Sequence, residues 1–394
     1  MKKLFAALLI AGNLFACTTA DAEVKTYTGT DEYIMSEFET IDIAKQRARQ
    51  KAERNAQEKA GVYISSYSET RDMELVTDEI VSIACGIMSV TDVKYDVQPL
   101  ADVNGFVIRA TVTANIDSDD VNKWLTKGAQ ERSSLVAQNK ELQRAVNEQS
   151  NTIEKLKAQI VQLKADGKFN DKHDREQVTA EIAAEDKIFQ ANLKLEEAQK
   201  KFIAHDFAAV IKLCDEALTL DPKSAIAYGK RGAALSVMNQ PQQSIADLNK
   251  AIELDPTNAD NYVNRGASHG NLKNFTAAVE DFSKAIELDP KNAMAYNNRG
   301  STLRFLGNVQ QGLQDLNKAI ELNPKIDIAY FNRAFCHIAT GNLPPAVADL
   351  DKAIELRPNF AMAYYVRGQC YQMQGRITQA QADFDKARQL GYSG

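Results

Sequence analysis

Apolar residues recur with two periods along the first third of the chain, and each period predicts one kind of element. Within residues 40–60, alanine returns at every fourth position (44, 48, 52, 56 and 60) and so lies along one face of a helix that a sheet can approach closely. Gly61 follows, where a left-handed residue commonly ends a helix. Residues 78–88 have the pattern of a second, shorter helix.

Three segments alternate between apolar and polar residues and therefore predict strands, at residues 62–67, 93–98 and 106–114. Residues 99–105 separate the last two, and their proline and glycine suit a hairpin turn. With the helices, these strands predict an α+β domain over residues 23–127, in which helices pack on an antiparallel sheet.

A heptad pattern follows over residues 131–165. Leucine occupies most d places, and β-branched residues occupy the later a places, Val146, Ile153 and Ile160. This favours a coiled coil between chains, most simply a homo-oligomer that is a dimer, with a trimer left open. The alternative is one amphipathic helix packed on a neighbour in the same chain. Residues 166–186 lack apolar periodicity and predict a polar linker.

A dipeptide ending in proline recurs every 34 residues in the second half of the chain, first as Asp221-Pro222 and last as Arg357-Pro358. Units counted from this spacing begin at residues 225, 259, 293, 327 and 361, after a more divergent unit that begins near residue 191. Each of the five has tyrosine at its fourth place and glycine or alanine at its eighth, where two helices nearly touch.

This pattern resembles that of the tetratricopeptide repeat (TPR) family. The resemblance covers residues 187–394 and implies an all-α superhelix of stacked antiparallel helix pairs, whose first helices line a concave groove. The lysines of the TPR carboxylate clamp are absent from the second and fifth places. A C-terminal acidic tail is therefore not the ligand that the resemblance implies.

A second periodic pair is expected to join the helices. Arginine occupies the seventh place of all five units and aspartate the twenty-third, whereas the divergent unit has Glu197 and Leu213 there. We expect each arginine to pair with an aspartate, either across its own helix pair or with the neighbouring unit, because a planar guanidinium suits a carboxylate.

Candidate binding residues lie on the first helices. Asparagine at the sixth place of three consecutive units predicts a ladder that grips a peptide backbone, because an amide donates and accepts at once. The ladder is similar to that of O-GlcNAc transferase repeats. The alternative is that asparagine is simply common at this place of the repeat and binds no ligand. The apolar candidates lie in the last three units, and about half of them are expected to pack between helices. The full set is Asn264, Asn298, Asn332, Met294, Phe305, Phe331, Phe335, Met362 and Tyr365.

Residues 1–22 have the charged and apolar regions of a secretory signal peptide. Two processing sites compete: cleavage after Ala22 would release a chain that starts at Glu23, whereas residues 14–17 resemble a lipobox that would lipidate Cys17. Both predict an exported protein of the periplasm or cell envelope, which contacts a membrane only if Cys17 is lipidated.

Composition narrows the function classes. The 394 residues are 44% apolar and 25% charged, as in globular proteins, and the net charge of −6 argues against a nucleic-acid partner. The four histidines have no metal-ligand spacing, and no phosphate-binding or nucleophile motif is present. The sequence therefore predicts no enzyme, no metal and no cofactor.

These features together predict a multidomain, exported scaffold that binds extended peptide segments of envelope partners during envelope assembly or maintenance. Its head, in the alanine-rich helix, residues 62–66 and the threonine-rich last strand, resembles the N-terminal domain of flagellar assembly protein T and small outer-membrane lipoproteins. That resemblance implies an assembly module without known chemistry. The alternative function is a structural spacer or tether that has no peptide client.

Overall fold

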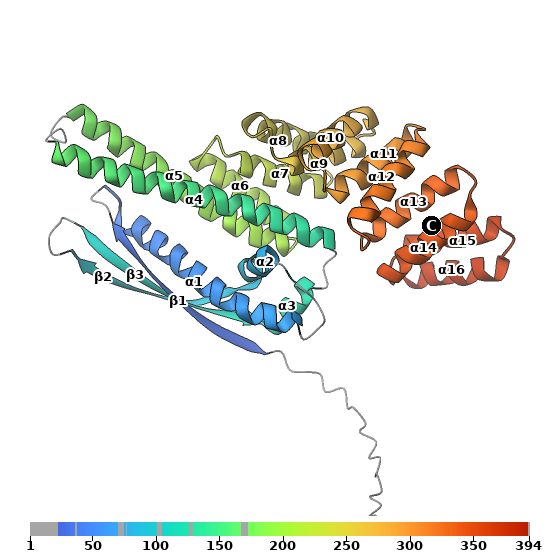
Figure 1. Cartoon of the computed structure of the whole chain (residues 1–394), viewed down its shortest axis with the longest axis horizontal. Helices are drawn as coiled ribbons and strands as arrows, with labels where there is room; N and C mark the ends of the chain where they lie inside the picture. Colours follow the sequence, from blue (N-terminus) through green and yellow to red (C-terminus); the bar gives the residue numbers. More distant parts are fainter. Residues whose placement is uncertain are drawn as a thin grey trace, which may run out of the picture.

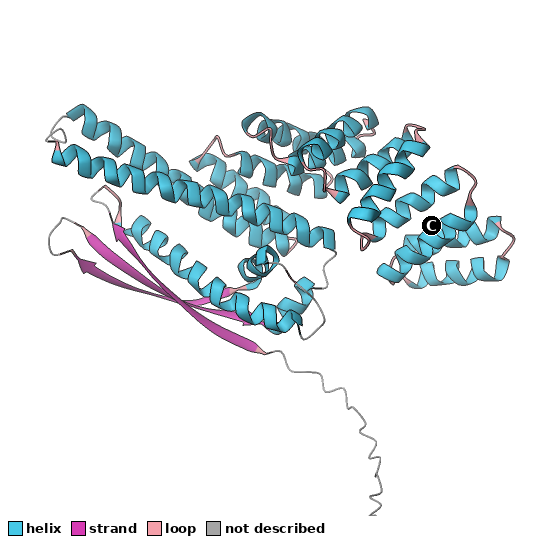
Figure 2. Cartoon of the chain, viewed as in Figure 1, coloured by secondary structure: helices cyan, strands magenta, loops and turns pink. Residues whose placement is uncertain are grey.

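The computed structural model describes most of the chain and shows a mainly helical molecule with a small sheet near the N-terminus (Figures 1 and 2). The described residues are 23–35, 38–69, 75, 77–100, 105–125, 129–166 and 172–392. The signal peptide expected at residues 1–22, including Cys17, lies outside them.

Three strands form the sheet in the order β1-β3-β2, and their bounds are Val24–Met35 (β1), Ser89–Pro99 (β2) and Phe106–Asp117 (β3). The expected hairpin is confirmed, since β2 pairs antiparallel with β3. Strand β1 was not anticipated from the sequence, although it pairs with β3 along its whole length. Its inward positions include Gly29 and Asp31, which hide the apolar alternation of a half-buried strand.

Helix α1 (Ile41–Glu69) packs along the sheet through its alanine stripe, which is fully buried as predicted. The strand expected at residues 62–67 is wrong, because α1 continues through this segment. Ile64 extends the four-residue stripe into the core, whereas Val62 is 71% exposed. Gly61 does not end the helix; a Cβ there would lie 3.1 Å from Ile80, so this glycine lets the next helix approach.

Two short helices complete the head, α2 (Thr77–Ile87), which was predicted, and α3 (Ser118–Leu125), which was not. They share one core with α1 and β3, in which Ile83 and Trp124 are buried with Ile64 and Ile116. The burial of Trp124, the one tryptophan of the sequence, makes its fluorescence a reporter of this core.

The heptad face of α4 (Ala129–Ala165) is buried inside the chain. Helix α5 (Lys172–Ile203) folds back along α4, and Leu156 and Ile160 pack on Val178 and Ile182. The coiled coil expected between chains is therefore replaced by the alternative interpretation, an amphipathic helix packed on its neighbour. The expected linker at 166–186 is also wrong from Lys172 onward, because its few apolar residues form one helical face against α4.

Since the heptad face is already covered, we expect a chain of residues 23–394 to be monomeric. Sedimentation velocity at micromolar concentration should give one species with the mass of a single chain. A dimer that persists on dilution, and that dissociates on substitution of exposed residues of α4, would contradict this prediction.

Helix α1 lies between the sheet and the α4–α5 hairpin (Figure 1). Polar contacts join the layers: Gln50 donates to Glu196 of α5 at 2.7 Å, and Arg54 donates to Asn147 of α4 at 3.0 Å. The head is thereby fixed to the first helix of the array.

The array consists of antiparallel helix pairs. The second half of α5 pairs with α6 (Phe207–Leu220), as expected of the divergent unit. The five following pairs are α7 (Ala225–Val237) with α8 (Pro241–Leu254), α9 (Ala259–Asn271) with α10 (Phe275–Leu288), α11 (Ala293–Phe305) with α12 (Val309–Leu322), α13 (Asp327–Ala339) with α14 (Leu343–Leu356), and α15 (Ala361–Met373) with α16 (Ile377–Gln389).

Candidate functional site

The five first helices begin at the residues that the 34-residue spacing indicates. Glycine at the eighth place lets the helices of four of the five pairs touch, and the fourth unit has Ala334 there. A Cβ on Gly300 would lie 2.8 Å from the carbonyl oxygen of Gly312 on α12. Helices α7, α9, α11 and α13 also contact one another in turn. We call the surface along α7, α9, α11, α13 and α15 the first-helix face; it is the surface on which the candidate binding residues were predicted.

Each seventh-place arginine pairs with the aspartate of its own helix pair, as one of the two alternatives predicted, and also donates to a side-chain oxygen of the preceding unit, which is an aspartate in two units and an asparagine or serine in three. Arg299 donates from Nε and Nη2 to Asp315 of its own pair, at 2.7 and 2.8 Å, and from Nη1 to Ser283 of the preceding unit at 3.1 Å. The same three-way contact repeats in all five units. The aspartates are buried. These pairs fix the packing of neighbouring units and leave the arginines unavailable to a ligand.

Helix α4 covers the first end of the first-helix face. Lys230, at the sixth place of α7, is 6% exposed, donates to Gln199 of α5 and lies 3.5 Å from Gln138 of α4. Glu141 of α4 accepts from Asn258 at 2.9 Å, just before α9. Burial lowers the pKa of Lys230 to about 8, although the charge of Glu141 opposes this. The sequence signal for this closure was a lysine where three later units have asparagine.

The three predicted asparagines lie half-buried on the open part of this face. A fourth residue, Asn297, links two of them: it donates to Asn298 at 3.0 Å and accepts from Asn332 at 2.9 Å. Asn264 lies one unit earlier, outside this chain of amide hydrogen bonds. Two units thus present connected amides, and Asn297 was missed because it occupies the fifth place.

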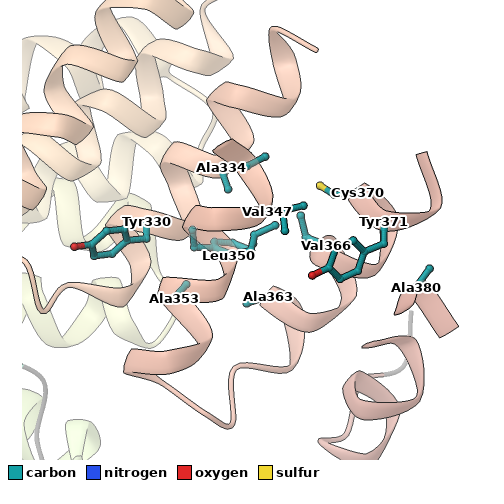
Figure 3. Packing of buried hydrophobic residues seen from close by; sticks show 12 residues of the cluster. Tyr330, Ala334, Val347, Leu350, Ala353, Ala363, Val366, Cys370, Tyr371 and Ala380 are labelled. Atoms are coloured by element: carbon teal, nitrogen blue, oxygen red, sulfur yellow. The ribbon is translucent and has the colours of Figure 1, made fainter. Parts of the chain in front are cut away.

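Two of the predicted apolar residues pack between helices. Phe331 is 8% exposed and contacts Phe360 with ring centroids 4.7 Å apart. Phe331 belongs to the core cluster of α13–α16, where Figure 3 shows Val347, Leu350 and Val366 side by side. Tyr365 contacts Tyr392 with ring centroids 4.4 Å apart. These two residues support the array more than they offer a surface.

Two of the other four apolar candidates are exposed, and Phe335 packs in part against the α13–α16 core. Phe305 and Met362 are 56% and 40% exposed, and Met294 and Phe335 are half-buried. Phe305 stacks against Phe275 of α10, with centroids 5.0 Å apart and planes 6° apart. Phe275 was not among the predicted residues, because it begins a second helix and reaches the first-helix face only through this stack.

The described residues offer no metal or redox site. They hold no cluster of three or more potential metal ligands and no disulfide, and Cys336 and Cys370 are buried. Burial raises the pKa of both thiols, which keeps them protonated. None of the described helices is both long and apolar enough to span a membrane.

Comparison with known proteins identifies the repeats. Family models described as tetratricopeptide repeat match residues 225–258, 259–292, 282–314, 328–360 and 350–382. The array consists of tetratricopeptide repeats. TPR folds are scaffolds for protein–protein interaction and are typically not enzymes. No curated protein matches the chain.

Several solved structures resemble the TPR array. MamA is 25% identical, and the match covers 40% of this chain and 93% of that chain, with a TM-score of 0.37. YrrB, described as a TPR protein with an unusual peptide-binding site, is 26% identical over 45% of this chain and 92% of that chain, with a TM-score of 0.37. PilF of Pseudomonas aeruginosa is 16% identical over 51% and 91% of the two chains, with a TM-score of 0.45.

Proposed function

We propose that this TPR protein is an interaction scaffold whose first-helix face binds an extended peptide segment of a partner protein. The observation that carries the proposal is the surface from α9 to α15, where linked amides adjoin accessible apolar side chains. An amide can bond a peptide backbone in both directions, and exposed aromatic rings on a repeat surface are typical of a binding site. The proposed function is binding and involves no catalysed reaction.

We further propose that the protein is exported and acts in the cell envelope. The support is the sequence of residues 1–22, which has the pattern of a signal peptide, with cleavage after Ala22 or lipidation at Cys17 as the two routes. The head would be the part that resembles flagellar assembly protein T. Its contacts with α5 would hold the TPR array at a fixed orientation to that head.

The test is capture of partners from an envelope extract by the full mature chain, residues 23–394. Replacing Asn264, Asn298 and Asn332 by alanine should lower the captured amount of a specific partner about tenfold or more, because each lost hydrogen bond to a bound backbone contributes about 0.5–1.5 kcal/mol. The amount is read by quantitative mass spectrometry.

A matched control is available at the sixteenth place of the same repeats, where three units also have asparagine. Asn274, Asn308 and Asn342 are exposed, and their side chains do not cap the helices they precede. Their triple alanine variant should capture as the wild type does. Because the test variant also deprives Asn297 of two partners, thermal melting must show that its array stays folded. If both variants capture the partner equally, the asparagine ladder does not take part in binding. If the wild type captures no specific partner, the alternative function, a structural spacer, is favoured.

A further inference from the structure

Arg304, near the end of α11, is the arginine of the TPR array that stands apart from all others. Within the described residues, no carboxylate oxygen lies within 4.0 Å of its guanidinium, and its Nε is buried without a hydrogen-bond partner. The other arginines of the array all lie against a side-chain oxygen; they are Arg231, Arg265, Arg299, Arg333, Arg357, Arg367, Arg376 and Arg388.

Aromatic rings hold this guanidinium in place. Its central carbon lies 4.1 Å from the ring centroid of Phe305 and 5.1 Å from that of Phe335 on α13. Phe305 is in turn backed by Phe275. Burial lowers the pKa of Arg304, so it has lost hydration without gaining an anion. A planar cation held between rings keeps its in-plane donors for a ligand.

The remaining charges on α11, α13 and α15 are compensated within the chain. Arg299, Arg333 and Arg367 pair with aspartates of the second helices, and Asp327 pairs with Arg357 at 2.6 Å. His337 lies 3.7 Å from Asp349. Arg304 is therefore the uncompensated charge on an otherwise amide-lined and apolar surface in this described part of the chain.

We propose that Arg304 recognises an acidic side chain, aspartate or glutamate, at an internal position of the peptide segment bound on the first-helix face. The argument is charge complementarity: a carboxylate would supply the acceptor that Arg304 lacks. The position is internal because first-helix surface continues on both sides, through Asn264 towards α9 and through Met362 on α15. This assignment rests on the proposed function and specifies its partner.

The test uses the full mature chain and three pools of acetylated, amidated, fluorescein-labelled nonapeptides. Each pool has aspartate, asparagine or lysine fixed at the centre, with flanks drawn from alanine, valine, leucine and phenylalanine. In fluorescence polarisation the aspartate pool should bind about five- to tenfold more tightly than the asparagine pool, and the lysine pool most weakly. The advantage of aspartate should shrink in 0.5 M salt, since the ionic contact is partly exposed.

Arg304→Gln should abolish the preference for aspartate while it leaves the affinity for the asparagine pool within about twofold. The matched control is Arg388→Gln on α16, whose guanidinium pairs with the exposed Asp385; it should retain the preference. Arg304→Lys keeps the charge without the planar fork and should retain part of it. Circular dichroism melts show whether each variant is folded.

The outcomes separate the two levels of the proposal. If the aspartate and asparagine pools bind the wild type equally, or Arg304→Gln keeps the preference, the surface is a peptide-binding site and the assignment of Arg304 is overturned. A fourth pool, with phosphoserine at the centre, tests the phosphorylated alternative: if it binds more than tenfold more tightly than the aspartate pool, a phosphopeptide replaces the acidic segment as the ligand class. If no pool binds the wild type, the proposed function fails and the assignment fails with it.

Discussion

Replacing Arg47 by methionine is expected to destabilise the head by about 3–5 kcal/mol, the cost of leaving buried carboxylates without their counter-charge. Arg47 lies on α1 with 7% of its side chain exposed, and it pairs with Glu39, which is 1% exposed. Its other Nη atom donates to Asp186 of α5 at 2.9 Å. Tyr33 of β1 accepts a further hydrogen bond from Arg47 at 3.0 Å.

The arginine therefore neutralises two acids that come from different layers of the molecule. Burial raises the pKa of Asp186, and the charge of Arg47 opposes that rise. Without Arg47, one or both acids must take up a proton or draw water into the contact between α1 and α5. We expect the head to unfold at lower denaturant concentration and to separate from α5 earlier. Urea titration followed by Trp124 fluorescence measures this.

The control is an equivalent change on the open face of the sheet. Arg109 pairs with Glu32 there, and both side chains are about half exposed, so Arg109→Met should cost far less than Arg47→Met. A triple variant in which Arg47→Met is combined with Glu39→Gln and Asp186→Asn should recover much of the loss, because both buried carboxylates are then neutral. Lys157, which lies 3.9 Å from Glu39, keeps Glu154 as its partner at 3.3 Å. Equal effects of Arg47→Met and Arg109→Met would show that the buried network adds nothing beyond a surface pair.

Gly29→Val is expected to be the most damaging change in the sheet, with a loss of about 3 kcal/mol or more, at the upper end of overpacking effects. Gly29 faces the alanine stripe of α1. A Cβ at this position would lie 2.5 Å from the backbone nitrogen of Ala56 and closer still to the carbonyl oxygen of Ala52. Backbone atoms cannot rotate away as a side chain does, so β1 and α1 must separate.

Gly270 provides a control at which replacing glycine should raise the stability instead of lowering it. It lies on α9, and a Cβ there would have no atom within 4 Å. Gly270→Ala should stabilise its helix by about 0.5–1 kcal/mol, because alanine loses less backbone entropy than glycine. Circular dichroism measures the unfolding of the helical array, and Trp124 fluorescence measures the unfolding of the head. A Gly29→Val chain with an unchanged head transition would contradict the close approach of α1 to the sheet.

The TPR array could be predicted almost completely from the sequence. Its period, its helix starts and its arginine–aspartate pairs all depend on contacts inside one unit or between adjacent units. Arg299 and Asp315, for example, are 16 residues apart, and the other acceptor of Arg299 is 16 residues earlier. A regular spacing therefore reports these contacts directly.

The head was predictable only in part, because its elements are decided by distant neighbours. The alternation at residues 62–67 is compatible with a strand, yet Ile64 completes a helical stripe once α2 and β3 supply a core. The polar strand β1 exists because β3 provides a whole edge of partners. Local pattern alone could not choose between these outcomes.

The candidate site was likewise predictable only where it depends on the repeat. The places of Asn264, Asn298 and Asn332 on one face follow from the repeat, whereas the link through Asn297 and the uncompensated charge of Arg304 depend on which side chains meet across units. By itself the sequence determined the repeat array and which face of α4 is buried, since both follow from periodicity. Only the tertiary structure decided that α5 covers that face and that α4 closes one end of the first-helix face, because a hydrophobic pattern states that a surface must be covered but does not say by what.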